Sequence, residues 1–258
     1  MEYTEGHAGD LGYWHNPKPL ALKAGTSPQL LELLRPFTHR CTQDDVAEAL
    51  PVLEHQTEWL AISGEQRKAY DEAARAGRML PWKREKLLDD VCRFDAVHSV
   101  KEQRTRALVR ARPSGSKTLV LTRTADEASA VGFAMDDARR GCVNLTGASE
   151  AQQRRLIEQF RNDPSVPVLI ADVLSQAGLE GLQVADLVIN FGVLSLAEEE
   201  KLAGRVRRLG SRHPKVTYRT LLTDTEHEHF KAIDQEDRDR DQRLILGGLA
   251  LHPTTRQD

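Results

Sequence analysis

The 258-residue chain is poor in cysteine and in aromatic residues. It has three cysteines, and Phe, Trp and Tyr together make up 5% of the sequence. The three cysteines, Cys41, Cys92 and Cys142, stand far apart and do not form a metal-binding spacing. An odd number of isolated cysteines is typical of a reducing compartment, so we expect a cytoplasmic protein, with the nucleus as the alternative.

The chain also lacks long apolar runs and an excess of positive charge. It has no run of about 18 apolar residues, and its first twenty residues include Glu2, Glu5 and Asp10, so neither a membrane span nor a signal peptide is expected. The formal net charge is −3, with 36 basic and 39 acidic residues. Any contact with nucleic acid must therefore come from a local basic patch.

A phosphate loop for nucleoside triphosphates is missing as well. The segment Ser114–Thr118, SGSKT, looks similar, but a Walker loop has Gly before its Lys and follows a strand. Here Ser116 precedes Lys117, and the apolar segment comes afterwards. No Asp-Glu pair ends an apolar segment either. The sequence therefore predicts no site that holds a triphosphate and its magnesium ion by itself.

Two nearby histidines, His227 and His229, also fall short of a metal site. Their i,i+2 spacing places them on different faces of a helix, whereas the zinc-binding helix pattern requires i,i+4. We therefore predict no metal site.

From Lys117 onward, short apolar segments alternate with longer amphipathic ones. Strands separated by helices of about 10 to 15 residues form a parallel sheet with helices on both faces, so the predicted fold class is α/β. We expect strands at 118–122, 143–146, 166–173, 187–191 and 216–223, and helices at 126–139, 150–162, 196–208 and 225–246.

The region before this alternation has a different texture, and Arg112-Pro113-Ser114-Gly115 is a natural boundary. Ser63 and Gln66 fit a helix capping box. The expected organisation is a poorly ordered lead at 1–26, a mainly helical linker region at 27–112 with one strand at 54–62, an α/β lobe at 113–248, and a tail at 249–258.

Two polar segments flank the apolar strand at 185–191. Ser175–Leu182 reads SQAGLEGL, and Lys201–Gly210 reads KLAGRVRRLG. Arginine grips phosphate oxygens with paired hydrogen bonds, and glycine lets backbone N–H groups approach a phosphate. This layout indicates a phosphate-binding face at one edge of the sheet. The alternative is a solvated basic helix and an ordinary turn.

Two further strands end in polar residues that would meet at the same edge of the sheet. Thr122 and Arg123 follow one strand, and Thr146 and Gly147 follow another. The carboxyl ends of parallel strands are where ligands of such sheets bind. Ordinary turns and helix caps are the alternative for each pair taken separately.

Taken in order, these segments resemble the carboxyl-terminal half, the second RecA-like lobe, of the SWI/SNF-type ATPases of helicase superfamily 2. SQAGLEGL is similar to motif V, S-x-x-A-G-x-x-G-L, and KLAGRVRRLG to motif VI, Q-x-x-G-R-x-x-R-x-G, although Lys201 replaces the Gln and Arg207 a His. The other similarities are Arg35–Pro51 with RPFMLRRTKEDV…LP, Ser63–Tyr70 with LSxxQxxxY, Ser99–Lys101 with S-x-K, Leu119–Arg123 with motif IV, Leu145–Phe160 with xxG…R…F, and Asp224–Gly248 with a TxEE helix ending in LGG.

The resemblance implies a fold and a set of site residues. The fold is a RecA-like lobe behind a mainly helical region, and ATP with Mg²⁺ lies between two such lobes, bound mostly by the first. Arg205 and Arg208 would be catalytic arginine fingers. The implied nucleotide contacts are Gly178, Glu180, Gly181, Arg205 and Arg208, and the implied contacts with the DNA backbone are Thr122, Arg123, Thr146, Gly147 and Ser175.

Two functions remain open at this point. The first is the C-terminal lobe of an ATP-dependent DNA helicase or translocase, inactive alone because Walker A and B motifs are absent. Its partner would be a first-lobe chain carrying GxGKT and DExH motifs. The second is a non-catalytic DNA- or protein-binding module derived from such a lobe. A membrane partner is not expected.

The strand at 54–62 raises a question about that partner. It stands far in sequence from the strands that begin at Thr118, and the resemblance implies that its counterpart completes the sheet of the first lobe. We therefore expect it to be unpaired in the chain alone, with Trp59, Leu60 and Ile62 exposed. It would then be donated to the first-lobe partner by strand addition.

Overall fold

The computed structural model describes most of the chain after residue 49: residues 50–76, 80–94, 96, 98–172, 180–208 and 211–250. The chain divides into two compact units, and the larger of them, Thr42–Arg240, contains the sheet. Among the described residues, no helix is both long enough and apolar enough to cross a membrane.

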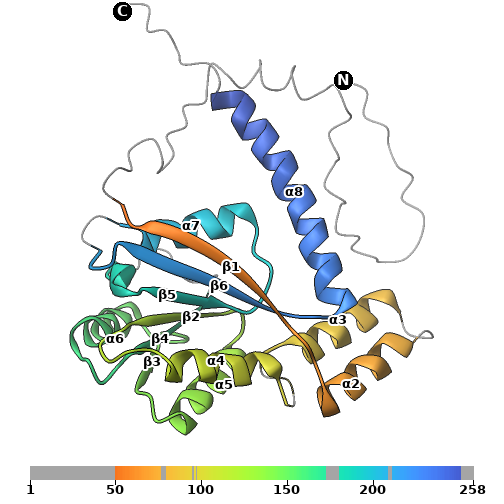
Figure 1. The fold of residues 1–258 in the computed structure, drawn as a ribbon, viewed down its shortest axis with the longest axis horizontal. Helices are drawn as coiled ribbons and strands as arrows, with labels where there is room; N and C mark the ends of the chain where they lie inside the picture. Colours follow the sequence, from red (N-terminus) through yellow and green to blue (C-terminus); the bar gives the residue numbers. More distant parts are fainter. Residues whose placement is uncertain are drawn as a thin grey trace, which may run out of the picture. The chain divides into compact units, whose positions relative to one another are not determined.

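Six strands of the described residues form one sheet, in which every pair of neighbours runs parallel (Figure 1). Their order across the sheet is β1-β6-β5-β2-β4-β3. The strands are β1 Val52–Leu60, β2 Thr118–Thr122, β3 Cys142–Asn144, β4 Val168–Asp172, β5 Leu187–Asn190 and β6 Lys215–Thr223. The predicted α/β, RecA-like fold with a parallel sheet is confirmed.

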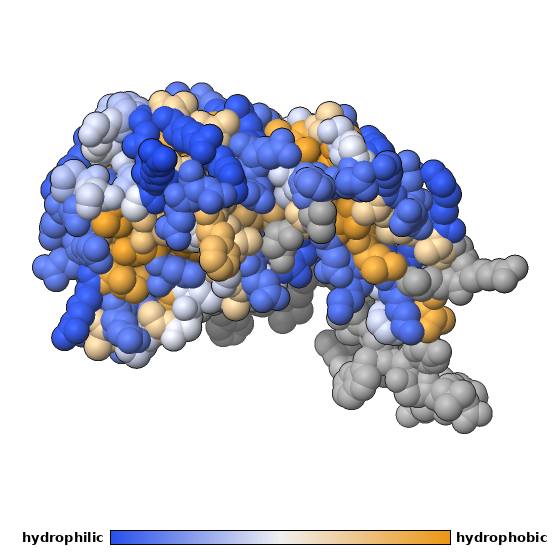
Figure 2. Space-filling view, turned by 90° about the horizontal axis from the view of Figure 1, so that it is seen from below, coloured by the Kyte–Doolittle hydropathy of each residue, from blue (hydrophilic) through white to orange (hydrophobic). Residues whose placement is uncertain are grey.

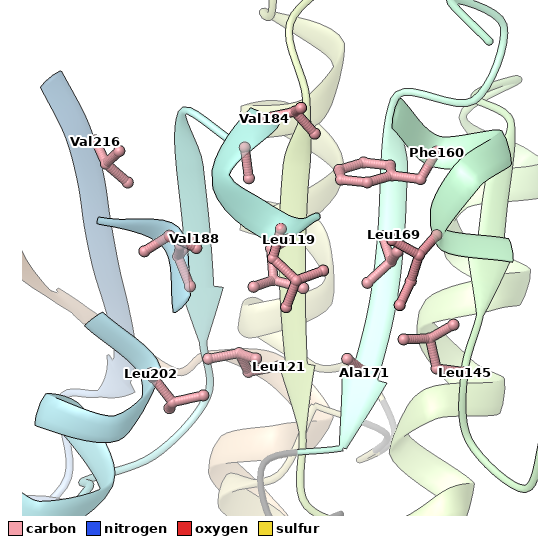
Figure 3. Packing of buried hydrophobic residues seen from close by; sticks show 14 of the residues in the cluster. Leu119, Leu121, Leu145, Phe160, Leu169, Ala171, Val184, Val188, Leu202 and Val216 are labelled. Atoms are coloured by element: carbon pink, nitrogen blue, oxygen red, sulfur yellow. The ribbon is translucent and has the colours of Figure 1, made fainter. Parts of the chain in front are cut away.

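Helices cover both faces of the sheet because its central strands are apolar on both sides. In β2, Leu119 and Leu121 point to one face and Val120 to the other, so they join two different cores. The first core lies under α6 and α7, and Figure 3 shows Phe160 of α6 and Leu202 of α7 packed over it. The second core lies under α4 and α5. The bounds are α4 Val100–Arg110, α5 Ala125–Asp137, α6 Glu150–Asn162, η3 Leu182–Val184 (a 3₁₀ turn) and α7 Leu196–Val206.

β1 belongs to this sheet, which corrects the strand-donation prediction. It pairs with β6 along its whole length, from Val52 opposite Lys215 to Leu60 opposite Thr223. The expectation that residues 54–62 lack a sheet of their own is therefore wrong. Sequence distance was misleading because the neighbour of β1 is the last strand of the chain, and a parallel partner can be any strand that reaches the same edge.

Two helices between β1 and α4 form a small hairpin with its own core. They are α2 Gly64–Arg75 and α3 Pro81–Cys92, and Ile62, expected to be exposed, is buried between them. The predicted capping box at the start of α2 is not formed, because Ser63 makes no side-chain cap bond. Gln66 is instead buried, and it donates to the carbonyl of Val91 (2.9 Å) and accepts from the amide of Val100 (3.1 Å). It thereby joins the hairpin to α4.

The last helix, α8, spans Glu226–Ala250, and its residues up to 240 belong to the larger unit. A buried ion pair between Glu228 and Lys101 of α4 anchors its start, with a 2.6 Å distance between the charged atoms. Glu228 also accepts a hydrogen bond from the hydroxyl of Thr223 at the end of β6 (2.6 Å). α4, α8 and the carboxyl end of the sheet are thus held together by one buried polar network.

Candidate functional site

Three adjacent strands end side by side at the carboxyl edge of the sheet, as the sequence predicts. Thr122 at the end of β2 lies opposite Asp172 of β4, and Asn144 at the end of β3 lies opposite Ile170 of the same strand. Because neighbouring strands are about 4.8 Å apart, the segments after β2 and β3 begin about 10 Å from each other. Polar residues that follow these strands therefore form one surface.

Arg123 is an exposed cation of this surface. Its backbone amide donates to Glu127 of α5 (2.9 Å), and its guanidinium donates to the carbonyl of Val193, in the loop after β5. A Cβ atom on Gly192 would lie 3.3 Å from Nε of Arg123, so this glycine leaves room for the guanidinium. Thr122, by contrast, is fully buried and donates to the carbonyl of Ala171, so its side chain does not reach the surface.

Thr146 and Gly147 lie beside the first turn of α6. Gly147 has a φ of 74°, a left-handed conformation that favours glycine. The hydroxyl oxygen of Thr146 is shielded from solvent and finds no hydrogen-bond partner among the described residues. Both residues line an open depression of about 370 Å³. Helix N-termini favour anions, so the depression is suited to a backbone phosphate.

Arg155 is a further member of this depression that the sequence reasoning missed. It lies one turn after Gln152, which also lines the depression and caps α6 by accepting from the amide of Ser149 (2.9 Å). Arg155 is exposed, and no carboxylate among the described residues pairs with it. The signal available in the sequence was its i,i+3 spacing from the capping glutamine, which places both on one helix face.

Three side chains from three different elements fix the loop between β5 and α7. Lys101 donates to the carbonyl of Phe191 (2.8 Å), Asn190 to that of Gly192, and Arg123 to that of Val193. The first three carbonyls of this loop are therefore held in place. The loop leads directly into α7, the helix that carries the arginine cluster.

The arginine cluster lies at the opposite edge of the sheet, which corrects the expectation of a single phosphate-binding edge. α7 leaves the carboxyl end of β5 and must return to the amino end of β6, because the two strands are parallel neighbours. At its far end Arg207 donates to the carbonyl of Pro51, just before β1 begins (3.1 Å). Arg205 and Arg208 thus lie a full helix length away from Arg123.

The two predicted catalytic arginines differ in exposure. Arg205 is 8% exposed, and its pKa is lowered by burial and by the neighbouring charge of Arg208. Arg208 is half-buried, and its Nε donates to the carbonyl of Gly204 (3.0 Å). The expectation that both side chains are at least partly exposed holds for Arg208 and is wrong for Arg205.

Of the predicted motif V residues, the structure describes Glu180 and Gly181, whereas Ser175 and Gly178 lie outside the described residues. Glu180 is exposed. Gly181 has a φ of 97°, and a Cβ there would lie 3.0 Å from Ile157 and from Arg161 of α6. Its conformation and its closeness to α6 are sufficient reasons for a glycine at this position.

Two similarities to other kinds of site have structural explanations. Lys117 is buried, and its ammonium donates to the carbonyls of Asp163 (2.6 Å) and Val166 (2.9 Å), so it stabilises the segment between α6 and β4. His227 pairs with Asp89 of α3 (2.7 Å), and His229 stacks on Trp59 with 3.8 Å between the ring centres. In the described part of the chain, no three metal-binding side chains come together.

The fold matches the C-terminal lobes of SWI2/SNF2 ATPases. The Sulfolobus solfataricus SWI2/SNF2 ATPase core in complex with dsDNA has a TM-score of 0.59 and 20% identity, and the match covers 86% of this chain and 52% of that one. The C-terminal part of the Fun30 ATPase domain has a TM-score of 0.56 and 14% identity, with 78% and 99% covered.

The C-terminal domain of the Sulfolobus solfataricus SWI2/SNF2 ATPase is a further match, with a TM-score of 0.52 and 17% identity over 73% of this chain and 86% of that one. No protein-family model matches the chain, and no curated protein sequence does. The likeness is therefore one of fold. This chain corresponds to about half of the complete ATPase core with which it was compared.

Proposed function

We propose that this chain is the second lobe of an ATP-dependent DNA translocase or helicase of the SWI2/SNF2 type and works with a first lobe on another chain. The observation that carries the proposal is the separation of two groups of cationic and polar residues on one RecA-like lobe. Exposed Arg123 and the depression at Thr146 lie at the carboxyl edge, while Arg205 and Arg208 lie at the far end of α7. A motor lobe needs such a division between a polymer track and a nucleotide-facing arginine cluster.

The carboxyl edge would hold the DNA backbone. Arg123, the first turn of α6 and Arg155 offer cationic and N–H groups that suit phosphates, and contacts with phosphates are independent of sequence. Ser175 would belong to the same track. The dsDNA bound by the Sulfolobus ATPase core supports a duplex as the polymer.

The nucleotide would be shared between two chains. The described residues contain no acidic or histidine cluster for Mg²⁺, so a first lobe would supply the magnesium carboxylates and the phosphate loop. The residues here that fit ATP are the arginines at the end of α7, whose charge would offset the charge that builds up on the transferred phosphoryl group. Glu180, Gly178 and Gly181 would lie next to them.

The decisive experiment measures ATP turnover by the pure chain and by the chain mixed with a first-lobe chain that carries GxGKT and DExH motifs. We expect no appreciable turnover alone and DNA-stimulated turnover in the mixture. Robust magnesium-dependent hydrolysis by the pure chain would overturn the two-chain proposal, because this chain would then contain a complete site.

The burial of Arg205 favours a second candidate, a non-catalytic DNA-binding module. Arg205 is 8% exposed, so it would meet a phosphate only after a rearrangement of the end of α7. If DNA binds at the carboxyl edge while no first-lobe chain elicits turnover, this second function is the correct one.

A further inference from the structure

The helix α3 has a reversed charge pattern that its own stability does not explain. α2, α4, α6 and α7 each have an acidic residue in the first turn and a basic one in the last, as the helix dipole favours, and α5 and α8 share only the acidic first turn. α3 has no acidic residue in its first turn and no basic residue in its last. It begins instead with Lys83, Arg84 and Lys86, all of which are exposed, and ends with Asp89 and Asp90.

The three cations at the start of α3 are also available for a ligand. In the part of the chain that the structure describes, no carboxylate pairs with Lys83, Arg84 or Lys86. Elsewhere in the molecule, cations are commonly neutralised, as in the pairs Lys68–Glu65 and Arg238–Asp234. A concentration of free positive charge where the dipole disfavours it indicates a negatively charged partner.

An exposed tryptophan lies among these cations. Trp82 is 55% exposed, and the ammonium of Lys83 lies 5.3 Å from the centre of its ring. An exposed aromatic ring between basic side chains is the combination that proteins use to hold single-stranded nucleic acid, with bases stacked on the ring and phosphates on the cations. In the view of Figure 2, hydrophilic residues predominate and the apolar residues form separate groups among them.

This surface is continuous with the carboxyl edge of the sheet. A cavity of about 520 Å³ has Lys86 of α3 on one wall and Arg123 with Thr124 on another. Trp82 lies one helical turn before Lys86 and on the same face of α3 (i,i+4), so it extends this wall beyond the cavity. The cavity therefore lies between Arg123 and the part of α3 that carries Lys86, next to Trp82.

The acidic residues of the cavity would not oppose a nucleic-acid strand equally. Four of them pair with cations: Asp89 with Lys231, Asp90 with Arg93, Asp234 with Arg238 and Glu228 with Lys101. Glu85 and Glu127 also line the cavity, and no cation among the described residues pairs with either.

We propose that the start of α3, with Trp82 as a base-stacking platform and Lys83, Arg84 and Lys86 as phosphate contacts, is a second nucleic-acid site that takes a single-stranded segment. The inference rests on the proposed contact of DNA with Arg123 and deepens it. Such a lobe would hold single-stranded DNA at α3 and the backbone of a duplex at Arg123. It would therefore bind a junction of single- and double-stranded DNA more tightly than either kind of DNA alone.

The test measures binding of the full chain to a fluorescein-labelled oligothymidine of about 12 nucleotides, a length that one such site covers. Trp82→Ala is expected to weaken binding about 5- to 100-fold, the usual effect of losing one stacked base. The matched control is Phe133→Ala, which removes another exposed aromatic side chain (74% exposed), on α5, and should leave affinity unchanged. The same oligomer with abasic sites should bind wild type and Trp82→Ala equally.

Salt dependence separates stacking from charge. Lys86→Ala should reduce the slope of log affinity against log salt by about 0.7, whereas Trp82→Ala should leave the slope unchanged. Glu85→Gln should strengthen binding. If Arg123→Gln weakens binding while Trp82→Ala and Lys86→Ala match the Phe133→Ala control, the site at α3 is refuted and the proposed function stands. If none of these variants changes binding, the nucleic-acid track itself is wrong.

Discussion

The arginine next to the start of α7 and the arginine near its end differ in exposure. Before its start, Arg123 is exposed and held by a single backbone carbonyl, that of Val193. Near the end of α7, Arg205 is 8% exposed and, like its neighbour Val206, is buried. An exposed, singly held cation can exchange its partner for a phosphate at little cost, whereas a buried one responds only when the structure around it moves. Under the proposed function, Arg123 could therefore bind a phosphate without any change in the fold, whereas Arg205 would need the end of α7 to move.

The largest expected effect tests the arginine cluster. Arg208→Ala should lower ATP turnover by about 10³- to 10⁵-fold in the two-chain mixture, because it removes a charge that stabilises the transition state. Stability should change little, since the side chain is half-buried and bonded to the carbonyl of Gly204 in the preceding helix. The measurement is steady-state ATP turnover at saturating DNA, with the free energy of unfolding determined in parallel.

Arg212→Ala, an exposed change in the same region, is the matched control. Arg205→Ala should lower both turnover and stability because Arg205 is buried, which is how the two arginines can be told apart. Normal turnover in Arg208→Ala would mean that another residue of the cluster is the catalytic arginine, and Arg207 would be the next candidate.

The second effect tests the buried network that anchors the loop before α7. Lys101→Met should destabilise the fold by about 3–5 kcal/mol, because it leaves the Glu228 carboxylate buried without its cation. Lys68→Met, which breaks an exposed pair with Glu65, should cost less than about 1 kcal/mol. Chemical denaturation measures both. A loss of similar size in the two variants would show that the Lys101–Glu228 pair is solvated and does not fix the loop.

A smaller effect is expected at Gly192, beneath Arg123. Gly192→Ala places a methyl group 3.3 Å from Nε of Arg123 and should displace the guanidinium. We expect DNA affinity to fall about fivefold, the equivalent of one hydrogen bond. Gly132→Ala is the control, because a Cβ there meets no atom within 4 Å. In the Arg123→Gln background, Gly192→Ala should have no further effect; an additive loss would mean that Gly192 does not act through Arg123.

Much of this arrangement was predictable from the sequence because it depends on local patterns. The apolar segments and their spacing predict the parallel sheet. They also predict that Arg123 and Thr146 lie at the same edge of it. The start of α6 was predicted correctly, at Glu150, because its amphipathic pattern is unambiguous. These features depend on residues close to one another in the sequence.

What was not predictable depends on partners far away in the sequence. The pairing of β1 with β6 joins residues about 160 positions apart, and no local pattern identifies such a neighbour. Gln66 fits a capping box by spacing, but the carbonyl of Val91 and the amide of Val100 compete for its side chain. The burial of Arg205 likewise depends on how α7 packs on the sheet, whereas the sequence shows only an arginine near other arginines.

The smallest effect is expected at Thr146, and it has opposite signs for stability and for binding. The hydroxyl oxygen of Thr146 is buried without a partner among the described residues, so Thr146→Val should leave the free energy of unfolding unchanged or raise it by up to about 1 kcal/mol. If the hydroxyl donates to a phosphate of bound DNA, the same variant should weaken DNA binding about fivefold, because that phosphate loses one hydrogen bond. Thr146→Ser, which keeps the hydroxyl and removes the methyl group, should bind DNA like the wild type. Equal DNA affinity in Thr146→Val and wild type would remove Thr146 from the nucleic-acid track and leave Arg123 and Arg155 as its contacts at this edge.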